Sequence, residues 1–120
     1  MERRIQQALE ALSRSDFRSR FRLTDQDRRT VHERGLDTIR DHALTFVHDR
    51  IAPAFPPKDG RQTPWRGHPV FVAQHATATC CRRCLQKWHR IAKGAPLTRS
   101  EIEFVTALIM RWIEVQTTAD

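Results

Sequence analysis

Apolar residues recur at three- and four-residue steps through most of this chain, a spacing that predicts helices rather than strands. The first such series comprises Ile5, Ala8, Leu9 and Leu12. We therefore expect an amphipathic helix over residues 2–13. Residues 15–22 alternate Arg with Phe and are expected to form a short helical turn or an irregular basic segment.

Two further helices are predicted before the middle of the chain. Thr24 followed by acidic residues is typical of a helix start, and Gly35 of a helix end, so we expect a helix over about 24–34. The next apolar series continues from Leu36 to Ile51, where Pro53 prevents its continuation.

The segment 53–69 contains five prolines and two glycines and is predicted to be a long loop, either a binding element or a solvated connector. Pro69 is suited to the first position of a short helix that carries His75. A further helix is expected from Cys80 to about Ala92, before the Lys93–Gly94 stop.

The strongest helix signal lies near the C-terminus, where Thr98 and Glu101 form a capping box ahead of a broad apolar stripe. We expect this helix, over 98–116, to be the central element. The sequence thus predicts an all-α fold, a bundle of five or six helices with one long Pro/Gly-rich loop, with residues 1–120 forming a single domain.

Composition narrows the class of protein. No segment approaches the ~20 consecutive apolar residues that a membrane helix needs, and the basic start has no apolar stretch typical of a secretory signal. The three cysteines all lie between positions 80 and 84, which does not fit a dispersed disulfide framework. These features predict a cytoplasmic protein.

The net charge of +7 is unevenly distributed. Residues 51–100 hold nine Lys or Arg and one acid, Asp59, so this segment alone carries a net charge of +8. Such a concentration of positive charge predicts an anionic partner, with nucleic acid or another phosphate-bearing anion first among the candidates.

The same segment contains a potential metal site. Cys81-x-x-Cys84 followed by His89 has the ligand spacing of a small zinc module, and His75 or Cys80 could supply a fourth ligand. Thiolate and imidazole are the ligands that zinc prefers, so zinc is the expected cofactor.

Two alternatives remain open for the cysteines. On a regular helix, Cys81 and Cys84 share an apolar face with Leu85 and Trp88, which also fits plain core packing, and His89 lies at its border. A thiol at a helix start near His75 and several arginines would instead be reactive.

A basic surface is predicted beside these residues. Its candidate members are Arg61, Arg66, Arg82, Arg83, Lys87 and Arg90. We expect the last four to lie on the exposed face of the cysteine helix, where they bind phosphates or are simply solvated, and Trp65 offers an aromatic face for stacking.

One stretch carries a resemblance. The string from His68 to Cys81, continued by Cys84-Leu85 and Lys87-Trp88-His89, resembles a family of short bacterial proteins known only as a domain of unknown function. Phe17-Arg18-Ser19-Arg20-Phe21 and Ile109-Met110-Arg111-Trp112-Ile113 extend the likeness over nearly the whole chain. The resemblance implies a stand-alone bacterial protein and no particular reaction or cofactor.

Together these features predict a small metal-supported binding module with a surface that faces an anion or nucleic acid. Two other functions remain open. One is a small enzyme beside the 53–69 loop that uses a cysteine nucleophile or a metal-bound water. The other is an interaction protein with a metal-free thiol core.

Overall fold

The computed structural model describes residues 1–118, which form six α-helices and, within those residues, no strand. The helices are α1 (Glu2–Ser13), α2 (Asp25–Arg34), α3 (Leu36–Phe46), α4 (Pro69–Ala76), α5 (Arg82–His89) and α6 (Arg99–Thr118). A short 3-10 turn, η1 (Arg18–Arg20), follows α1, and a π-helical turn, η2 (Val47–Ile51), extends α3. The all-α prediction is confirmed.

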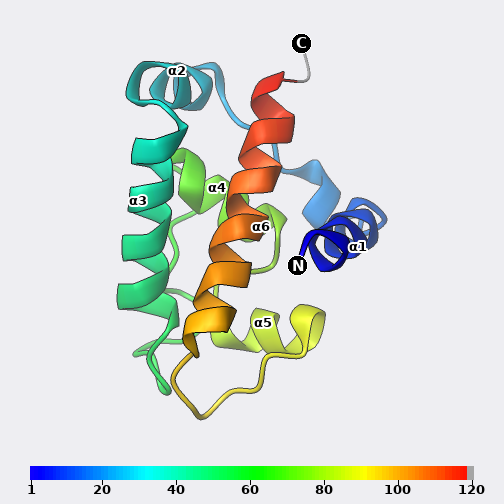
Figure 1. Ribbon diagram of the computed structural model, residues 1–120, viewed down its shortest axis with the longest axis vertical. Helices are drawn as coiled ribbons and strands as arrows, with labels where there is room; N and C mark the ends of the chain where they lie inside the picture. The colour runs from blue at the N-terminus through cyan, green and yellow to red at the C-terminus, as the bar shows by residue number, and fades with distance from the viewer. Residues whose placement is uncertain (119–120) are drawn as a thin grey trace.

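Helix α6 is the central element, as its apolar stripe predicted. It packs against α1, α3 and α4, and in Figure 1 it lies between α3 and α1. Its buried face includes Val105, Leu108 and Ile109. The expected capping box is present, since Thr98 N–H donates to Glu101 (2.8 Å) and Glu101 N–H donates to Thr98 Oγ1 (3.1 Å). None of the helices within residues 1–118 has the length and apolarity needed to cross a lipid bilayer.

The cysteine helix is shorter than predicted at both ends. Cys81 has an extended backbone and acts as the N-cap, so α5 begins at Arg82. At the other end Arg90 adopts the left-handed conformation (φ 58°), and Ile91 N–H bonds back to the Leu85 carbonyl. The left-handed residue ends the helix before Lys93–Gly94, so the expected continuation to Ala92 is wrong.

The expected exposure of Arg82 is also wrong, because its side chain is 1% exposed. Its guanidinium donates to five backbone carbonyls, those of Ile51, Ala52, Pro53, Ala92 and Ala95, at 2.8–3.4 Å. A helical wheel places Arg82 on the polar face, but at the first position of α5 this side chain is enclosed by two other chain segments. Arg82 therefore stabilises the fold and is removed from the predicted anion-binding surface.

Two histidines join α3 to the start of α4. His68 caps α4 because its Nδ1 accepts the Val70 N–H (3.0 Å), and its Nε2 lies 2.9 Å from Nδ1 of His42. Since His68 Nδ1 is an acceptor, its Nε2 carries the hydrogen and donates to His42. Burial, followed by the neighbouring His42, lowers the pKa of His68 to about 4. His68 is therefore neutral when it caps α4.

Replacing Arg82 with Ala should destabilise the protein by about 3 kcal/mol or more, because five backbone carbonyls lose their donor and a cavity remains where the buried side chain was. Arg83→Ala is the matched control. Its side chain is exposed, so the change should stay within about 0.5 kcal/mol. Urea unfolding followed by circular dichroism measures both, and equal stability of the two variants would contradict the structural role of Arg82.

The histidine pair predicts a loss of stability in acid. The folded-state pKa of His68 lies below the ordinary value of 6.5, so unfolded chains take up the proton first. Stability from this group is complete above about pH 6.5 and is lost as the pH falls towards 4. His68→Asn keeps a capping side chain that does not titrate.

Between pH 7 and 4.5 the His68→Asn variant should lose about 1 kcal/mol less stability than the wild type, a value reduced by solvent screening of the half-buried ring. Urea unfolding at the two pH values measures this difference. His48→Asn, at an exposed histidine, serves as the control. If His68→Asn loses as much stability as the wild type, the cap does not titrate as described.

Candidate functional site: a thiol cluster at the start of helix α5

The long loop before α4 is fixed against the cysteines. The Asp59 carboxylate accepts the backbone N–H groups of Arg82 (3.0 Å) and Arg83 (3.2 Å), the first two residues of α5. The Thr63 hydroxyl donates to the Cys80 carbonyl (2.8 Å). A negative side chain at a helix start also interacts favourably with the helix dipole. The loop therefore forms one wall of the site and is not a free connector.

Three thiols converge behind this wall. The Sγ atoms of Cys80, Cys81 and Cys84 all lie within 4.8 Å of one another. Cys80 and Cys81 are buried, whereas Cys84 is half-buried. Cys84 N–H donates to Cys81 Sγ (3.4 Å), the contact that caps the helix. Such a cluster has the ligand chemistry and proximity needed to hold a metal ion.

Arg18 brings a positive charge onto the thiols. Its guanidinium donates to Cys84 Sγ (3.2 Å) and lies 3.8 Å from Cys80 Sγ, while it also donates to the His75 carbonyl (2.7 Å). Arg18 lies at the start of the η1 turn, and this turn contacts α4. The contact brings the guanidinium to cysteines that lie more than sixty residues later in the chain.

The three thiols differ in acidity. Hydrogen bonds from Cys80 and Cys81, and then the Arg18 guanidinium, lower the pKa of Cys84 far below its ordinary value despite partial burial. The same thiol hydrogen bonds, together with burial, raise the pKa of Cys80. In the metal-free cluster the Arg18 guanidinium therefore favours deprotonation of Cys84 over that of Cys80.

His75 lies beside the cluster with one ring nitrogen committed. Its Nε2 is 3.1 Å from the carbonyls of Thr63 and Pro64, so this nitrogen carries the hydrogen. The other nitrogen, Nδ1, is buried, and no hydrogen-bond partner within residues 1–118 reaches it. Burial lowers the pKa of His75, which keeps the ring neutral. Nδ1 thus presents a free lone pair. It lies outside the cluster of three Sγ atoms that are within 4.8 Å of one another.

His89 is less suited to the predicted metal site. Its Nε2 lies 2.8 Å from the Thr77 carbonyl, its ring packs edge-on against Phe104, and it lies outside the thiol cluster. Of the five predicted ligands, the structure brings together Cys80, Cys81 and Cys84. The contacts of His89 with Thr77 and Phe104 account for the histidine that follows Cys84 in the sequence.

An aromatic cluster lies next to the thiols. Trp65 from the loop stacks on His75 (centroids 3.9 Å apart) and lies parallel to Phe21 (6.2 Å), and Phe17 meets both Phe21 and Trp65 edge-on. Trp65 and Phe17 are 61% and 49% exposed. Five of the predicted anion-binding residues have exposed side chains: Arg61, Arg66, Arg83, Lys87 and Arg90.

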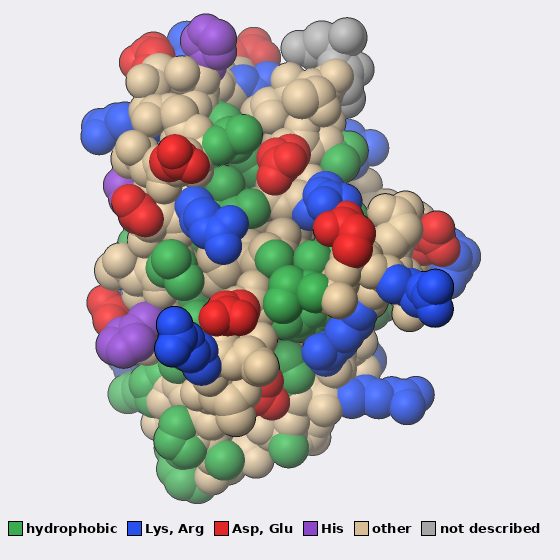
Figure 2. All heavy atoms as spheres, viewed as in Figure 1, with side chains coloured by type: hydrophobic (Ala, Val, Ile, Leu, Met, Phe, Trp, Pro, Cys, Tyr) green, Lys and Arg blue, Asp and Glu red, His purple; other side chains and the backbone are tan. Residues whose placement is uncertain are grey.

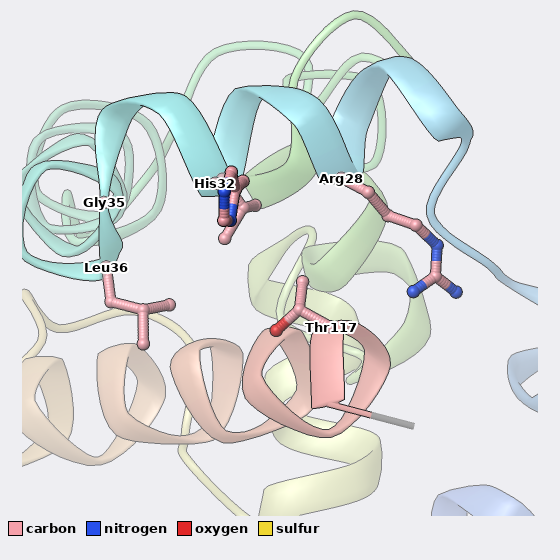
Figure 3. A pocket seen from close by; sticks show the side chains of 6 residues that line it. Arg28, His32, Gly35, Leu36 and Thr117 are labelled. Carbon is pink, nitrogen blue, oxygen red and sulfur yellow. The ribbon is translucent and has the colours of Figure 1, made fainter. Parts of the chain in front are cut away.

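Two hollows in the surface differ in their relation to the site. The first, of about 400 Å³, is lined by Arg28, Val31, His32, Gly35, Leu36 and Thr117. It lies between α2 and the end of α6, far from the α5 end of the molecule (Figures 1 and 3). The second, a groove of about 510 Å³ between α1, η1 and α6, is lined in part by Arg18, so Arg18 contacts both this groove and the thiols.

Sequence reasoning missed two residues of the site. Arg18 is more than sixty positions from the cysteines, and its only signal was its place in the Phe17–Phe21 string that carries the family resemblance. Asp59 had a clearer signal, since it is the one acidic residue between positions 51 and 100. A lone acid in so basic a segment indicates a specific partner, here the start of α5.

Comparison with known proteins agrees with the resemblance in the sequence. No solved structure matches the chain. The family described as Domain of unknown function (DUF4186) matches residues 6–114, nearly the whole chain, and the protein therefore belongs to this family.

Proposed function

We propose that the protein binds a single zinc ion through Cys80, Cys81 and Cys84. The observation that carries this proposal is the convergence of three Sγ atoms within 4.8 Å of one another at the start of α5. Plain core packing explains buried cysteines, but it does not explain why a guanidinium donates to two of the three sulfurs. A cation in that position suits a site that carries negative charge.

Charge balance favours a divalent, thiophilic ion. Three thiolates around Zn²⁺ leave one net negative charge, and the Arg18 guanidinium compensates for it. Binding must displace the protons of Cys80 and Cys81, whose pKa values are raised in the metal-free cluster. Metal affinity should therefore increase with pH.

His75 is the candidate for the fourth ligand. Metal-binding histidines usually donate their second ring N–H to a carbonyl or carboxylate, which is the arrangement of His75 with Thr63 and Pro64. The remaining nitrogen, Nδ1, is buried with a free lone pair. A shift of this ring towards the thiols would complete a site with three sulfurs and one nitrogen. A water molecule is the alternative fourth ligand.

The zinc proposal predicts about one equivalent of zinc in protein purified without a histidine tag, and a Cys84→Ser variant whose affinity is at least about 100-fold weaker. His75→Gln should weaken binding by about 10- to 100-fold if its ring is a ligand. His89→Gln is the matched control and should bind like the wild type.

Metal analysis and competition with a chromogenic chelator measure these affinities, and Co²⁺ substitution reports the number of sulfur ligands. Less than about a tenth of an equivalent of metal, with thermal stability unaffected by a chelator, would contradict the zinc site.

A second proposal concerns the exposed surface around Trp65, which we infer binds single-stranded nucleic acid. The specific observation is the pair of exposed rings, Trp65 and Phe17, in the same aromatic cluster. Arg61 and Arg66 flank Trp65 in the exposed loop, and the Arg83 guanidinium lies directly over Gly60. Stacking of bases on aromatic rings beside basic side chains is the usual mode of binding to single strands.

The distribution of charge supports this location. Basic and acidic side chains are interspersed over the face seen in Figure 2, so that face has no uniform positive patch. Instead, the segment 51–100, whose net charge is +8, includes the loop and α5. Arg82 contributes nothing to this surface because it is buried.

Binding to single-stranded DNA or RNA should weaken steeply with salt, and combined replacement of Arg61, Arg66 and Arg83 by Ala should reduce the log–log slope by about 0.7 for each phosphate that the variant no longer binds. Trp65→Ala should weaken binding by about 1–3 kcal/mol with little change in slope. Arg40→Ala, at an exposed residue of α3, is the control. Fluorescence anisotropy at two salt concentrations measures all four proteins. Affinity weaker than about 10⁻⁴ M at physiological salt would contradict the proposal.

A further inference from the structure

The thiol cluster has a second chemical capability that metal binding does not require. Cys84 is the most accessible of the three thiols, and it is the sulfur closest to the Arg18 guanidinium (3.2 Å). Arg18 also lines the groove between α1, η1 and α6, so one face of this side chain is open to small molecules in solvent. A small oxidant therefore reaches Cys84 more readily than the two buried sulfurs.

Cys81 is placed to react with an oxidised Cys84. It is the N-cap of α5 and Cys84 is the third residue of the helix, so the two lie on the same helical turn, and Cys84 N–H donates to Cys81 Sγ. Residues three apart on a helical turn have Cα atoms about 5–6 Å apart, within the range that a disulfide spans.

Cys80 is less suited to that role. The Cys80 sulfur also lies within 4.8 Å of the other two, but residue 80 precedes the helical turn that Cys81 and Cys84 share, and its carbonyl is held by the Thr63 hydroxyl. A bond between Cys80 and Cys81 would have to close a strained ring through a single peptide unit.

We propose that Cys84 and Cys81 form a peroxide-responsive disulfide site, in which Cys84 is oxidised first, Cys81 resolves the intermediate and Cys80 remains a thiol. The Cys84 sulfur attacks one oxygen of hydrogen peroxide, so an S–O bond forms, the O–O bond breaks and hydroxide leaves, which takes a proton to become water. Cys81 sulfur then attacks Cys84 sulfur, the S–S bond forms, and the hydroxyl group leaves as a second water with the remaining thiol proton. The peroxide is reduced, two thiols are oxidised, and the Arg18 guanidinium lies 3.2 Å from the sulfur that begins the sequence.

Oxidation would also release a metal from the cluster, since a disulfide removes two of the three thiolates. This consequence rests on the proposed zinc site. Formation of the disulfide does not rest on the zinc site, because Cys81 and Cys84 already share one helical turn. The two ideas can therefore be tested separately.

The sequence offers a convenient assay, because trypsin cleaves at Arg82 and Arg83, between the two sulfurs. Metal-stripped protein is treated with hydrogen peroxide, free thiols are alkylated, and the digest is analysed by mass spectrometry. A disulfide from Cys84 to either Cys81 or Cys80 links two peptides, whereas a Cys80–Cys81 disulfide stays within one. The single Cys→Ser variants distinguish the two linked forms.

We expect the linked peptides in the wild type and in Cys80→Ser, and their absence from Cys81→Ser and Cys84→Ser. In Cys81→Ser, dimedone should trap a sulfenic acid on Cys84. Arg18→Gln should slow oxidation of Cys84 about tenfold, and circular dichroism verifies that each variant is folded.

Linked peptides of undiminished yield in Cys81→Ser would overturn the assignment of Cys81, and a dimedone adduct on Cys80 or Cys81 instead of Cys84 would overturn the order of reaction. Complete alkylation of all three thiols after peroxide treatment would overturn the site altogether. Zinc release is measured separately on zinc-loaded protein, where about one equivalent should appear as the disulfide forms. A protein that forms the disulfide but holds no zinc would contradict only the proposed metal function.

Discussion

Five backbone carbonyls converge on the buried guanidinium of Arg82, and the position of the thiol cluster depends on this contact. The carbonyls come from the end of η2 and from the chain after α5, so one side chain ties together both ends of the region that holds the cysteines. Removal of a buried donor from several acceptors costs far more than a surface contact contributes. With Arg82 in place and Asp59 on the first N–H groups, the start of α5 is fixed, and Cys81 and Cys84 are fixed with it.

A second cation then determines the chemistry of the thiols. Arg82 is hydrogen-bonded to neutral carbonyls, whereas Arg18 is hydrogen-bonded to sulfur and to one carbonyl. Arg18 is half-buried, and a cation in contact with thiols stabilises their negatively charged form. Two arginines at the start of α5 thus have different roles: Arg82, from α5 itself, acts in folding, and Arg18, from η1, acts in the electrostatics of the site.

Features of the fold that depend on local periodicity could be predicted from the sequence. Features that depend on contacts between residues far apart in the chain could not. The apolar steps and the caps at Thr24 and Thr98 placed the helices within a few residues, because these signals act over one or two turns. The spacing of Cys81 and Cys84 identified the site for the same reason. The error at Arg82 arose because a helical wheel treats every position as part of a long helix, whereas the first residue of a short helix is surrounded by the segments that enter and leave it. Arg18 has no such local signal, since its partners are defined only by the packing of η1 on α4.

Metal binding and disulfide formation both require short distances between sulfurs, yet they make different demands on the third cysteine. A Cys-x-x-Cys pair at a helix start is enough for a disulfide, and Cys80 adds nothing to it. A tetrahedral metal ion needs four ligands, and three converging thiolates supply all but one of them. The presence of Cys80 in the cluster, held there by the Thr63 hydroxyl on its carbonyl and by Arg18 beside its sulfur, is therefore a feature that metal binding uses and a disulfide does not. Peroxide chemistry at Cys84 and Cys81 then follows from the same proximity, as a reaction that would end metal binding.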